Sequence, residues 1–343
     1  MDTIFKKLTV ISIILIYLII VAGAVVRMTG SGMGCPDWPK CFGYYIPPTS
    51  ESQIQWKPEH LYKQGTIVIK NEELRLAKEN FTSTSQYQED NWLPYTKHDY
   101  AEFNVWHTWI EYINRLVTVL SGLPILLLFI LSFRYLKTNK RITQLAIITV
   151  LAMAFQAWLG KIVVDTNLAP VRITVHMLVA FLIAAILIMM LYEQQPERKK
   201  VEVSKTFKSI LVFSIILTFI QVAMGTQVRQ YVDEQVKLAL SKSEWLTPTP
   251  VIFYVHRSFS VLIVLVNAWL FLQNRKLSLG LTKLNWVMFL IALEVITGIA
   301  MYYLDFPFLT QPLHLVIASL LFGIQFYLLL QVFYNRKQSV LLT

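Results

Sequence analysis

Long apolar runs recur along the whole chain, and mostly short polar connections separate them. A run of about 20 apolar residues is long enough to cross the hydrocarbon core of a bilayer as one helix. The first run has no small-residue cleavage site, so we expect it to be retained as a span. The pattern predicts transmembrane helices over residues 8–28, 105–133, 142–163, 171–192, 209–228, 251–272, 284–303 and 312–334. We therefore expect an all-α integral membrane protein with eight transmembrane helices.

The last four runs repeat the first four. The first and fifth runs end in similar sequences, which carry Arg27 and Arg229. Gly160 precedes His176 by as many residues as Gly298 precedes His314. Four spans in each repeat give both halves the same orientation, related by an axis along the membrane normal. The sequence thus predicts two four-helix bundles in parallel orientation, within residues 1–195 and 205–343.

The net charge of +10 is distributed unevenly along the chain. Lys and Arg gather in the connections on one side of the predicted membrane, and the short connections on the other side carry few. This positive-inside pattern argues for membrane orientation and against nucleic-acid binding. It predicts cytoplasmic termini and an outer position for the long first loop, about residues 30–103. The lack of a transit peptide favours the inner (plasma) membrane of a bacterial cell.

The long first loop is polar, and we expect it to be irregular. It contains both cysteines of the chain, Cys35 and Cys41. Because disulfides persist on the outer side of a membrane, we expect these two residues to form a bridge that closes a small loop. Two free thiols are the alternative.

The second apolar run begins with an unusual sequence, W-H-T-W-I-E-Y-I-N-R, from Trp106 to Arg115. At helical spacing, His107, Glu111 and Asn114 lie on one face. A carboxylate inside a membrane helix is costly and is a functional-site hypothesis by default. The alternative is a structural ion pair between Glu111 and Arg115.

Four of the six histidines are predicted near the outer ends of their helices, at positions 107, 176, 256 and 314. His256 and His314 occupy the sixth and eighth runs of one bundle, which makes them a natural bis-imidazole pair for a haem iron. The repeat relates them to Asn114 and His176. Because an asparagine amide is not a competent haem ligand, a haem in the first bundle would have His176 and a second position that is weak, open or supplied by His107. Packing or hydrogen bonding is the alternative for each histidine.

Five arginines are predicted near the same outer surface. A guanidinium group binds a carboxylate through two parallel hydrogen bonds, so these residues are candidates for binding haem propionates. The alternative is that they extend to lipid headgroups. The five are Arg27, Arg115, Arg172, Arg229 and Arg257. Glu294, deeper in the seventh run, is assigned no role.

Five motifs spread over nearly the whole chain resemble those of the haem A synthases. They read V-R-M-T-G-S-G-M-G-C-P-D-W-P-K-C, I-E-Y-I-N-R, L-G-K-I-V-V-D-T-N-L-A-P, M-G-T-Q-V-R and Q-P-L-H-L. The resemblance implies an enzyme that oxidises a ring methyl of haem O to a formyl group by successive steps. It implies haem b as cofactor in the C-terminal half and haem O as substrate in the N-terminal half. It also implies membrane lipid, haem O synthase and cytochrome oxidase assembly factors as partners.

The resemblance also implies roles for individual residues. Glu111 would be the essential carboxylate, and Cys35–Cys41 would match the outer-loop disulfide of the family. Haem b would be held by His256 and His314, and the substrate haem would face His176. Apart from the resemblance, position along the chain makes Arg257 and Arg229 candidates for the haem b site, and it makes Asn114, Arg115, Arg27 and His107 candidates for the substrate-haem site. Many members have histidine where Asn114 stands, and some have a second cysteine pair in the third outer loop that is absent here.

Two other functions explain part of the pattern. A dihaem b-type cytochrome that transfers electrons from quinol would account for the histidines, but not for Glu111 or for the asymmetry at Asn114. A secondary transporter with parallel repeats would have broken helices near the middle of the membrane. The polar residues of this chain cluster at the outer ends of the helices, which favours the haem enzyme.

Overall fold

The computed structural model describes residues 3–96, 103–166, 168–195 and 201–334. Eight helices in these ranges are long and apolar enough to cross a membrane, as the apolar runs predict. They are α1 (Thr3–Met28), α2 (Val105–Ser132), α3 (Lys140–Asp165), α4 (Pro170–Glu193), α5 (Lys205–Lys237), α6 (Val251–Lys276), α7 (Lys283–Tyr303) and α8 (Thr310–Phe333). The all-α membrane fold is therefore confirmed.

Helix α5 is longer than its apolar run. The run ends near residue 228, but the helix continues to Lys237. The added turns carry Arg229 and Asp233, which form an ion pair at i and i+4 along the helix. Such pairs stabilise a helix after its apolar stretch has ended. The difference therefore comes from charged residues that a hydropathy pattern does not count as helical.

Local sequence signals set where the helices near the site begin. The Asn104 side chain accepts hydrogen bonds from the backbone N–H groups of Trp106 and His107 and so caps α2. Pro170 opens α4, at a position where a backbone N–H has no partner within the helix. These starts place Glu111 and His176 within about two turns of the N-terminal ends of their helices.

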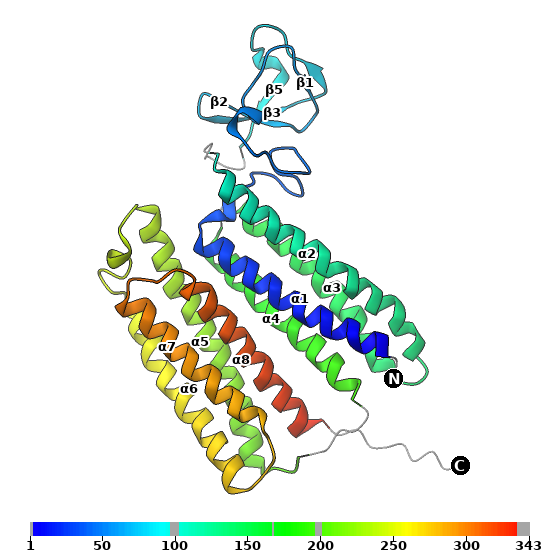
Figure 1. The fold of residues 1–343 in the computed structure, drawn as a ribbon, viewed down its shortest axis with the longest axis vertical. Helices are drawn as coiled ribbons and strands as arrows, with labels where there is room; N and C mark the ends of the chain where they lie inside the picture. Colours follow the sequence, from blue (N-terminus) through cyan, green and yellow to red (C-terminus); the bar gives the residue numbers. More distant parts are fainter. Residues whose placement is uncertain (1–2, 97–102, 167, 196–200, 335–343) are drawn as a thin grey trace.

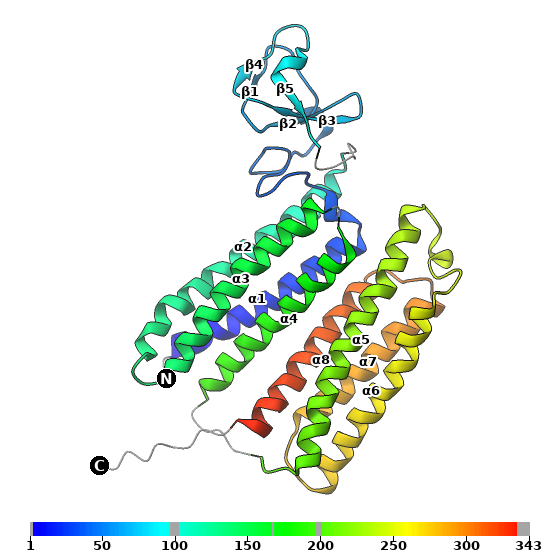
Figure 2. The same cartoon turned by 180° about the vertical axis from the view of Figure 1, so that it is seen from behind.

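The helices form two four-membered rings (Figures 1 and 2). In the first ring α1 packs against α2 and α4, and α3 packs against the same two helices. In the second ring α5 packs against α6 and α8, and α7 packs against those two. In both views α1 and α5 run in the same direction. Diagonal members of each ring, such as α2 and α4 or α6 and α8, therefore face each other across the interior of a bundle.

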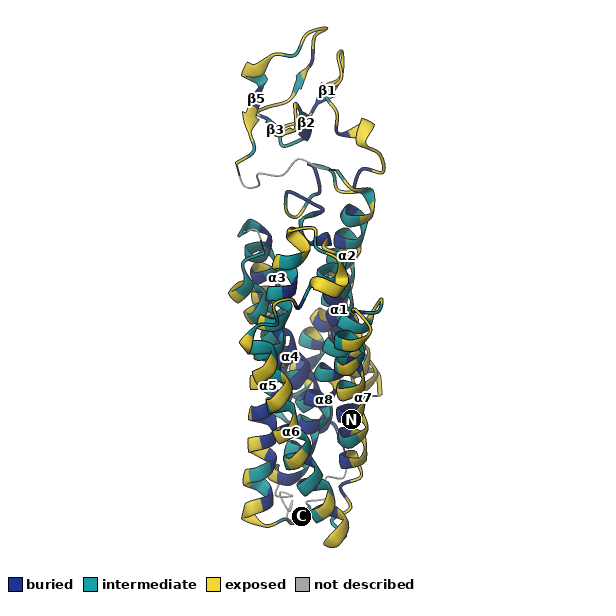
Figure 3. Ribbon diagram, turned by 90° about the vertical axis from the view of Figure 1, so that its left-hand side faces the viewer, coloured by how far each residue is buried: buried dark blue, intermediate teal, exposed yellow. Residues whose placement is uncertain are grey.

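An apolar seam joins the two rings. Helix α8 packs against α1 and α4, and α4 also contacts α5. Phe181 of α4 stacks on Phe322 of α8, with the ring centroids 5.6 Å apart. Phe219 of α5 meets Phe322 edge to face at 4.7 Å. Buried residues are numerous on α4 and α8, the helices that meet at this seam (Figure 3). The two rings are thus held together by close apolar packing.

The long first loop is not irregular, and this corrects the expectation from the sequence. It contains two small antiparallel sheets beyond the outer end of α2 (Figure 1). In one, β1 (Leu61–Tyr62) pairs with β4 (Phe81–Thr82). In the other, β3 (Glu73–Ala77) lies between β2 (Ile67–Lys70) and β5 (Trp92–Pro94). Three of these strands, β1, β4 and β5, have only two or three residues, too few for an alternating pattern to be recognised.

Aromatic packing holds this outer region together. Tyr62 and Trp92 are buried, with their ring centroids 5.0 Å apart, and Phe81 packs against both. Buried aromatic rings contribute large apolar areas and prefer such edge-to-face contacts. The outer region therefore has a small core of its own.

Candidate functional site

Each odd-numbered helix presents a glycine to one polar side chain on the even-numbered helix that follows it. A Cβ added to any of these glycines would come within 4 Å of that side chain. The pairs and distances are Gly23 to Asn114 Oδ1, 3.9 Å; Gly160 to His176 Cε1, 3.4 Å; Gly225 to His256 Cε1, 3.1 Å; and Gly298 to His314 Cε1, 3.8 Å. The same packing thus recurs in four successive helical hairpins. It places one polar side chain at a corresponding position on α2, α4, α6 and α8.

The repeated hairpins create two facing pairs of side chains. His256 of α6 and His314 of α8 belong to opposite members of the second ring. Asn114 of α2 and His176 of α4 hold the matching places in the first ring. The second bundle therefore pairs two imidazoles, and the first pairs an imidazole with an amide.

Three atoms at these positions are buried without a hydrogen-bond partner in the described part of the chain. They are Nδ1 of His176, Nδ1 of His256 and Oδ1 of Asn114. Leaving a buried polar atom unpaired costs roughly 1–3 kcal/mol, so such positions favour an occupant. Two facing imidazoles are the donor set of a bis-histidine haem. The residues of the second bundle thus fit a six-coordinate haem, and those of the first fit a haem with one strong protein ligand.

His314 differs from the other two histidines in its surroundings. Its Nδ1 lies 2.8 Å from Oε2 of Glu294 and 2.8 Å from Oγ1 of Thr297, both on α7. Glu294 was given no role from the sequence. A signal was present, because Glu294 stands four residues before Gly298, as Gln156 and Gln221 stand before Gly160 and Gly225. The structure shows that this position faces the helix carrying the histidine.

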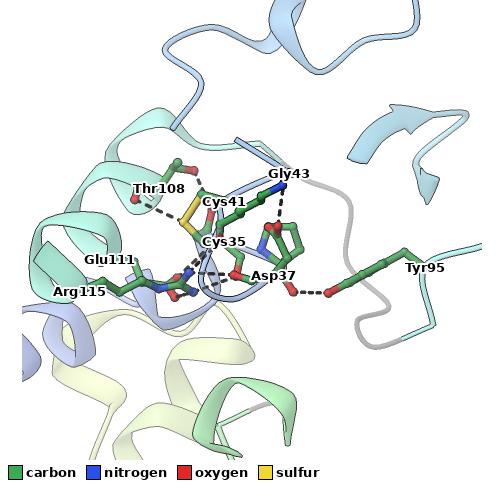
Figure 4. The surroundings of a disulfide bond; sticks show 11 residues. Cys35, Asp37, Cys41, Gly43, Tyr95, Thr108, Glu111 and Arg115 are labelled. Carbon is green, nitrogen blue, oxygen red and sulfur yellow. Dashed lines mark hydrogen bonds and ion pairs between the residues drawn. A yellow bond between two sulfur atoms is a disulfide. The ribbon is translucent and has the colours of Figure 1, made fainter. Parts of the chain in front are cut away.

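Glu111 lies in a closed polar site at the outer end of α2 (Figure 4). The residue is 3% exposed, and its Oε2 accepts a hydrogen bond from the backbone N–H of Cys35 at 2.9 Å. Its Oε1 forms an ion pair with Arg115. The Arg115 guanidinium also donates to the carbonyl oxygens of Asp37, at 2.7 Å, and Lys40, at 2.9 Å. The carboxylate therefore has both a cationic partner and a backbone donor.

The disulfide loop packs directly on the first turns of α2. Cys35 and Cys41 are joined, as the sequence predicts. Thr108 donates its hydroxyl to the carbonyl of Gly34 at 2.7 Å. A Cβ at Gly34 would fall 2.4 Å from the backbone carbonyl of His107, so only glycine allows this approach. The bridge, Glu111 and Arg115 form one unit, with the bridge adjoining α2 in Figure 4.

Asp37 is the second acid of this unit. Burial raises the pKa of its carboxyl above the usual range, although the hydrogen bond from the Gly43 N–H and the charge of Arg115 oppose that change. A raised pKa means that ionising Asp37 opposes folding of the loop. The stabilising contribution of this group is complete below its unfolded pKa and is lost as the pH rises through the folded value.

The remaining arginines have other partners. Arg27 of α1 and Arg229 of α5 both bind Asp233, with N–O distances of 2.9 and 2.6 Å. Arg229 also donates to the backbone carbonyl of Arg27 at 3.0 Å. Asp233 was not singled out from the sequence, because no spacing along the chain indicates that it lies beside α1. These three residues form a polar link between the two bundles, near the C-terminal ends of α1 and α5.

Arg257 and Arg172 are not part of that link. The guanidinium of Arg257 lies over the rings of Phe253 and Tyr254, 5.8 and 5.3 Å from their centroids. Arg172, in the first turn of α4, is exposed. Their position at the outer surface of the membrane stays a prediction.

Comparison with known proteins adds a family to this geometry. A family model described as cytochrome oxidase assembly protein, COX15-CtaA, matches residues 6–67 and 55–326. A protein named heme A synthase from Wolbachia pipientis wMel is 24% identical over 95% of this chain and 91% of its own length. Proteins of the same name from Shouchella clausii and Bacillus licheniformis are each 24% identical. They cover 95% and 98% of this chain, and 96% and 99% of their own lengths.

Proposed function

Because this chain belongs to the COX15-CtaA family of cytochrome oxidase assembly proteins, we propose that it oxidises a ring methyl of haem O to the formyl group of haem A. The protein is a membrane oxidoreductase that modifies haem. Its similarity to proteins named heme A synthase extends over nearly the whole chain. Haem O is then the substrate.

One observation carries the proposal for where each haem binds. The glycine packing is the same in all four hairpins. In the second bundle the glycines pack against two histidines, and in the first they pack against His176 and Asn114. We assign haem b to His256 and His314 in the C-terminal half, residues 205–343. We assign haem O to the N-terminal half, residues 1–195, with His176 towards its iron. Bound haem b supplies one-electron transfer, so it serves as the electron carrier.

The other residues assigned to the two haems keep these roles as proposals. Arg115 donates to loop carbonyls, and Arg27 forms an ion pair with Asp233. Direct contact of either arginine with a substrate propionate therefore requires exchange of these bonds. Arg229 has the same restriction on the haem b side, and Arg257 is free of an acidic partner among the described contacts. His107, one turn before Glu111, remains the candidate second ligand of the substrate haem.

Glu111 is the residue that we assign to the chemistry. Oxidation of a methyl group requires a proton to leave carbon and positive charge at that carbon to be stabilised, and a fixed carboxylate can do either. The second half has Phe253 at the matching position while it keeps the arginine as Arg257. At this repeat position, a carboxylate is therefore present only in the half that is proposed to hold the substrate.

The proposed setting follows from the charge pattern. Lys and Arg flank the inner ends of the helices, so we place both termini in the cytoplasm and the strands β1 to β5 outside the inner membrane. Haem O synthase is an expected partner because it must deliver the substrate. The assembly factors of cytochrome oxidase are expected partners because they must receive the product.

Co-expression tests the proposed function. A host that makes haem O but lacks haem A should accumulate haem A when it expresses this chain, and chromatography of extracted haems measures the conversion. Cells with an inactive variant provide the baseline. A dihaem cytochrome acting on quinol would leave haem O unconverted, and that result would reject the synthase.

Replacing Asn114 with histidine tests the asymmetry between the bundles. The second ring accommodates an imidazole beside Gly225, and Gly23 leaves comparable room beside residue 114. We expect Asn114→His to give a six-coordinate substrate haem with altered turnover and an unchanged haem b spectrum. Low-temperature optical spectra of the purified variant, with and without haem O, measure both. A change in the haem b spectrum would contradict the assignment of the two haems to separate bundles.

A further inference from the structure

We propose that Glu294 is a positioning residue for His314, and that its charge makes haem b harder to reduce. This inference rests on the proposed haem b site. The carboxylate of Glu294 lies 2.8 Å from Nδ1 of His314 and so holds the imidazole in one orientation. The other ring nitrogen, Nε2, would then be the one left to bind the iron. The reduction potential of haem b is the property that this contact controls.

The hydrogen bonds around His314 define which nitrogen carries the proton. Oγ1 of Thr297 lies 2.8 Å from Nδ1 and also 2.9 and 3.0 Å from the carbonyl oxygens of Leu293 and Glu294. The threonine hydroxyl can donate to one of those carbonyls, which leaves its oxygen to accept from Nδ1. An ionised carboxylate is also only an acceptor. Nδ1 therefore donates, and Nε2 keeps its lone pair for a metal.

The repeated hairpins show that this carboxylate is a special feature of α7. At the matching positions, the amides of Gln156 and Gln221 donate to the backbone carbonyls of His176, at 2.9 Å, and His256, at 3.0 Å. Those amides brace the helix, and among the described residues neither forms a hydrogen bond with an imidazole ring. Glu294 replaces the amide with a charge and contacts the ring itself. The two histidines proposed for haem b thus differ in their surroundings. A carboxylate contacts the ring of His314, whereas a neutral amide contacts only the backbone of His256.

The energetics favour a functional explanation for this charge. A carboxylate within a membrane helix is costly to insert and rarely lies there without a function. The side chain of Glu294 is only 16% exposed, and its Oε1 is buried without a hydrogen-bond partner among the described residues. A partner that donates to such a carboxylate becomes a stronger electron donor to its metal. A negative charge beside the haem also stabilises the ferric form relative to the ferrous form.

Redox titration of the purified protein with bound haem b tests the inference. Glu294→Gln introduces the residue found at positions 156 and 221 and removes the charge while keeping an acceptor. We expect the low-spin spectrum to remain and the ferrous form to be favoured at least about tenfold, a positive shift of about 59 mV for a one-electron couple. Glu294→Leu, which removes the acceptor as well, should shift the potential further in the same direction.

Two further variants separate positioning from packing. Gln221→Leu removes a hydrogen bond to the backbone of α6 and should leave the potential unchanged. Thr297→Val leaves the carboxylate as the acceptor for Nδ1, so the potential should stay at or below that of the natural protein. This variant carries the test if Glu294→Gln does not retain haem.

The results that would contradict the role of Glu294 differ from the results that would contradict the proposed function. A haem b potential that is unchanged in Glu294→Gln, or raised in Thr297→Val, would overturn the role of Glu294. Absence of haem b from the unaltered protein would instead reject the proposed haem site.

Discussion

Alanine at His256 or at His314 abolishes the low-spin haem b spectrum: this is the largest effect that we expect from any single substitution outside the chemistry. Each imidazole supplies one axial ligand from opposite sides of the second ring, so a single loss leaves the iron without one of its two strong protein ligands. Neither position has a neighbouring imidazole on its own helix that could take over. Optical spectra of the reduced, purified variants measure the outcome.

The control for these variants is His60→Ala. His60 lies in the outer strand region, where its ring packs edge to face against Tyr62 at 4.7 Å, and it should not affect the spectrum. His176→Ala provides a second comparison, because it should leave haem b in place and weaken only the binding of haem O. A normal spectrum in both the His256 and the His314 variants would rule out this ligand pair.

Glu111→Gln and Glu111→Ala should keep haem b and accumulate unconverted or partly oxidised haem O. Removal of a general base or of a charge that stabilises the transition state costs about 100-fold or more in rate. Chromatography of extracted haems, compared with the unaltered protein in the same host, gives the conversion. The reduced haem b spectrum reports whether the second bundle has folded.

A structural role of Glu111 is the competing explanation, because the carboxylate also binds Cys35 and Arg115. Glu111→Gln keeps an acceptor for the Cys35 N–H, so the disulfide loop should remain attached. Mass spectrometry of non-reduced peptides from intact membranes should still find Cys35 linked to Cys41. Loss of conversion with the loop intact supports chemistry at Glu111. Near-normal haem A production by Glu111→Ala would support the ion-pair explanation.

The eight membrane helices were predictable because length and apolarity decide whether a segment spans a bilayer. The repeat was equally informative, because it identified His256, His314, His176 and Asn114 as corresponding positions before any contact was known. The disulfide followed from the position of Cys35 and Cys41 in an outer loop. All of these inferences depend on local pattern or on the comparison of one half with the other.

The features that the sequence did not predict depend on contacts between distant segments. Asp233 gains its importance from Arg27, which reaches it from α1. The anchoring of Glu111 requires the Cys35 backbone to lie on α2, which the absence of a side chain at Gly34 permits. The outer strands are short, and their small core of Tyr62, Phe81 and Trp92 forms only when the loop folds back on itself. Spacing within one segment contains none of this information.

The haem content of the purified protein tests the central claim most directly. We predict that protein isolated from a host that makes haem O contains haem b together with haem O or haem A, and that His256→Ala loses only the haem b. Chromatography of the acid-extracted haems distinguishes the three. Protein that contains haem b alone at two per chain, or no haem at all, would contradict the account.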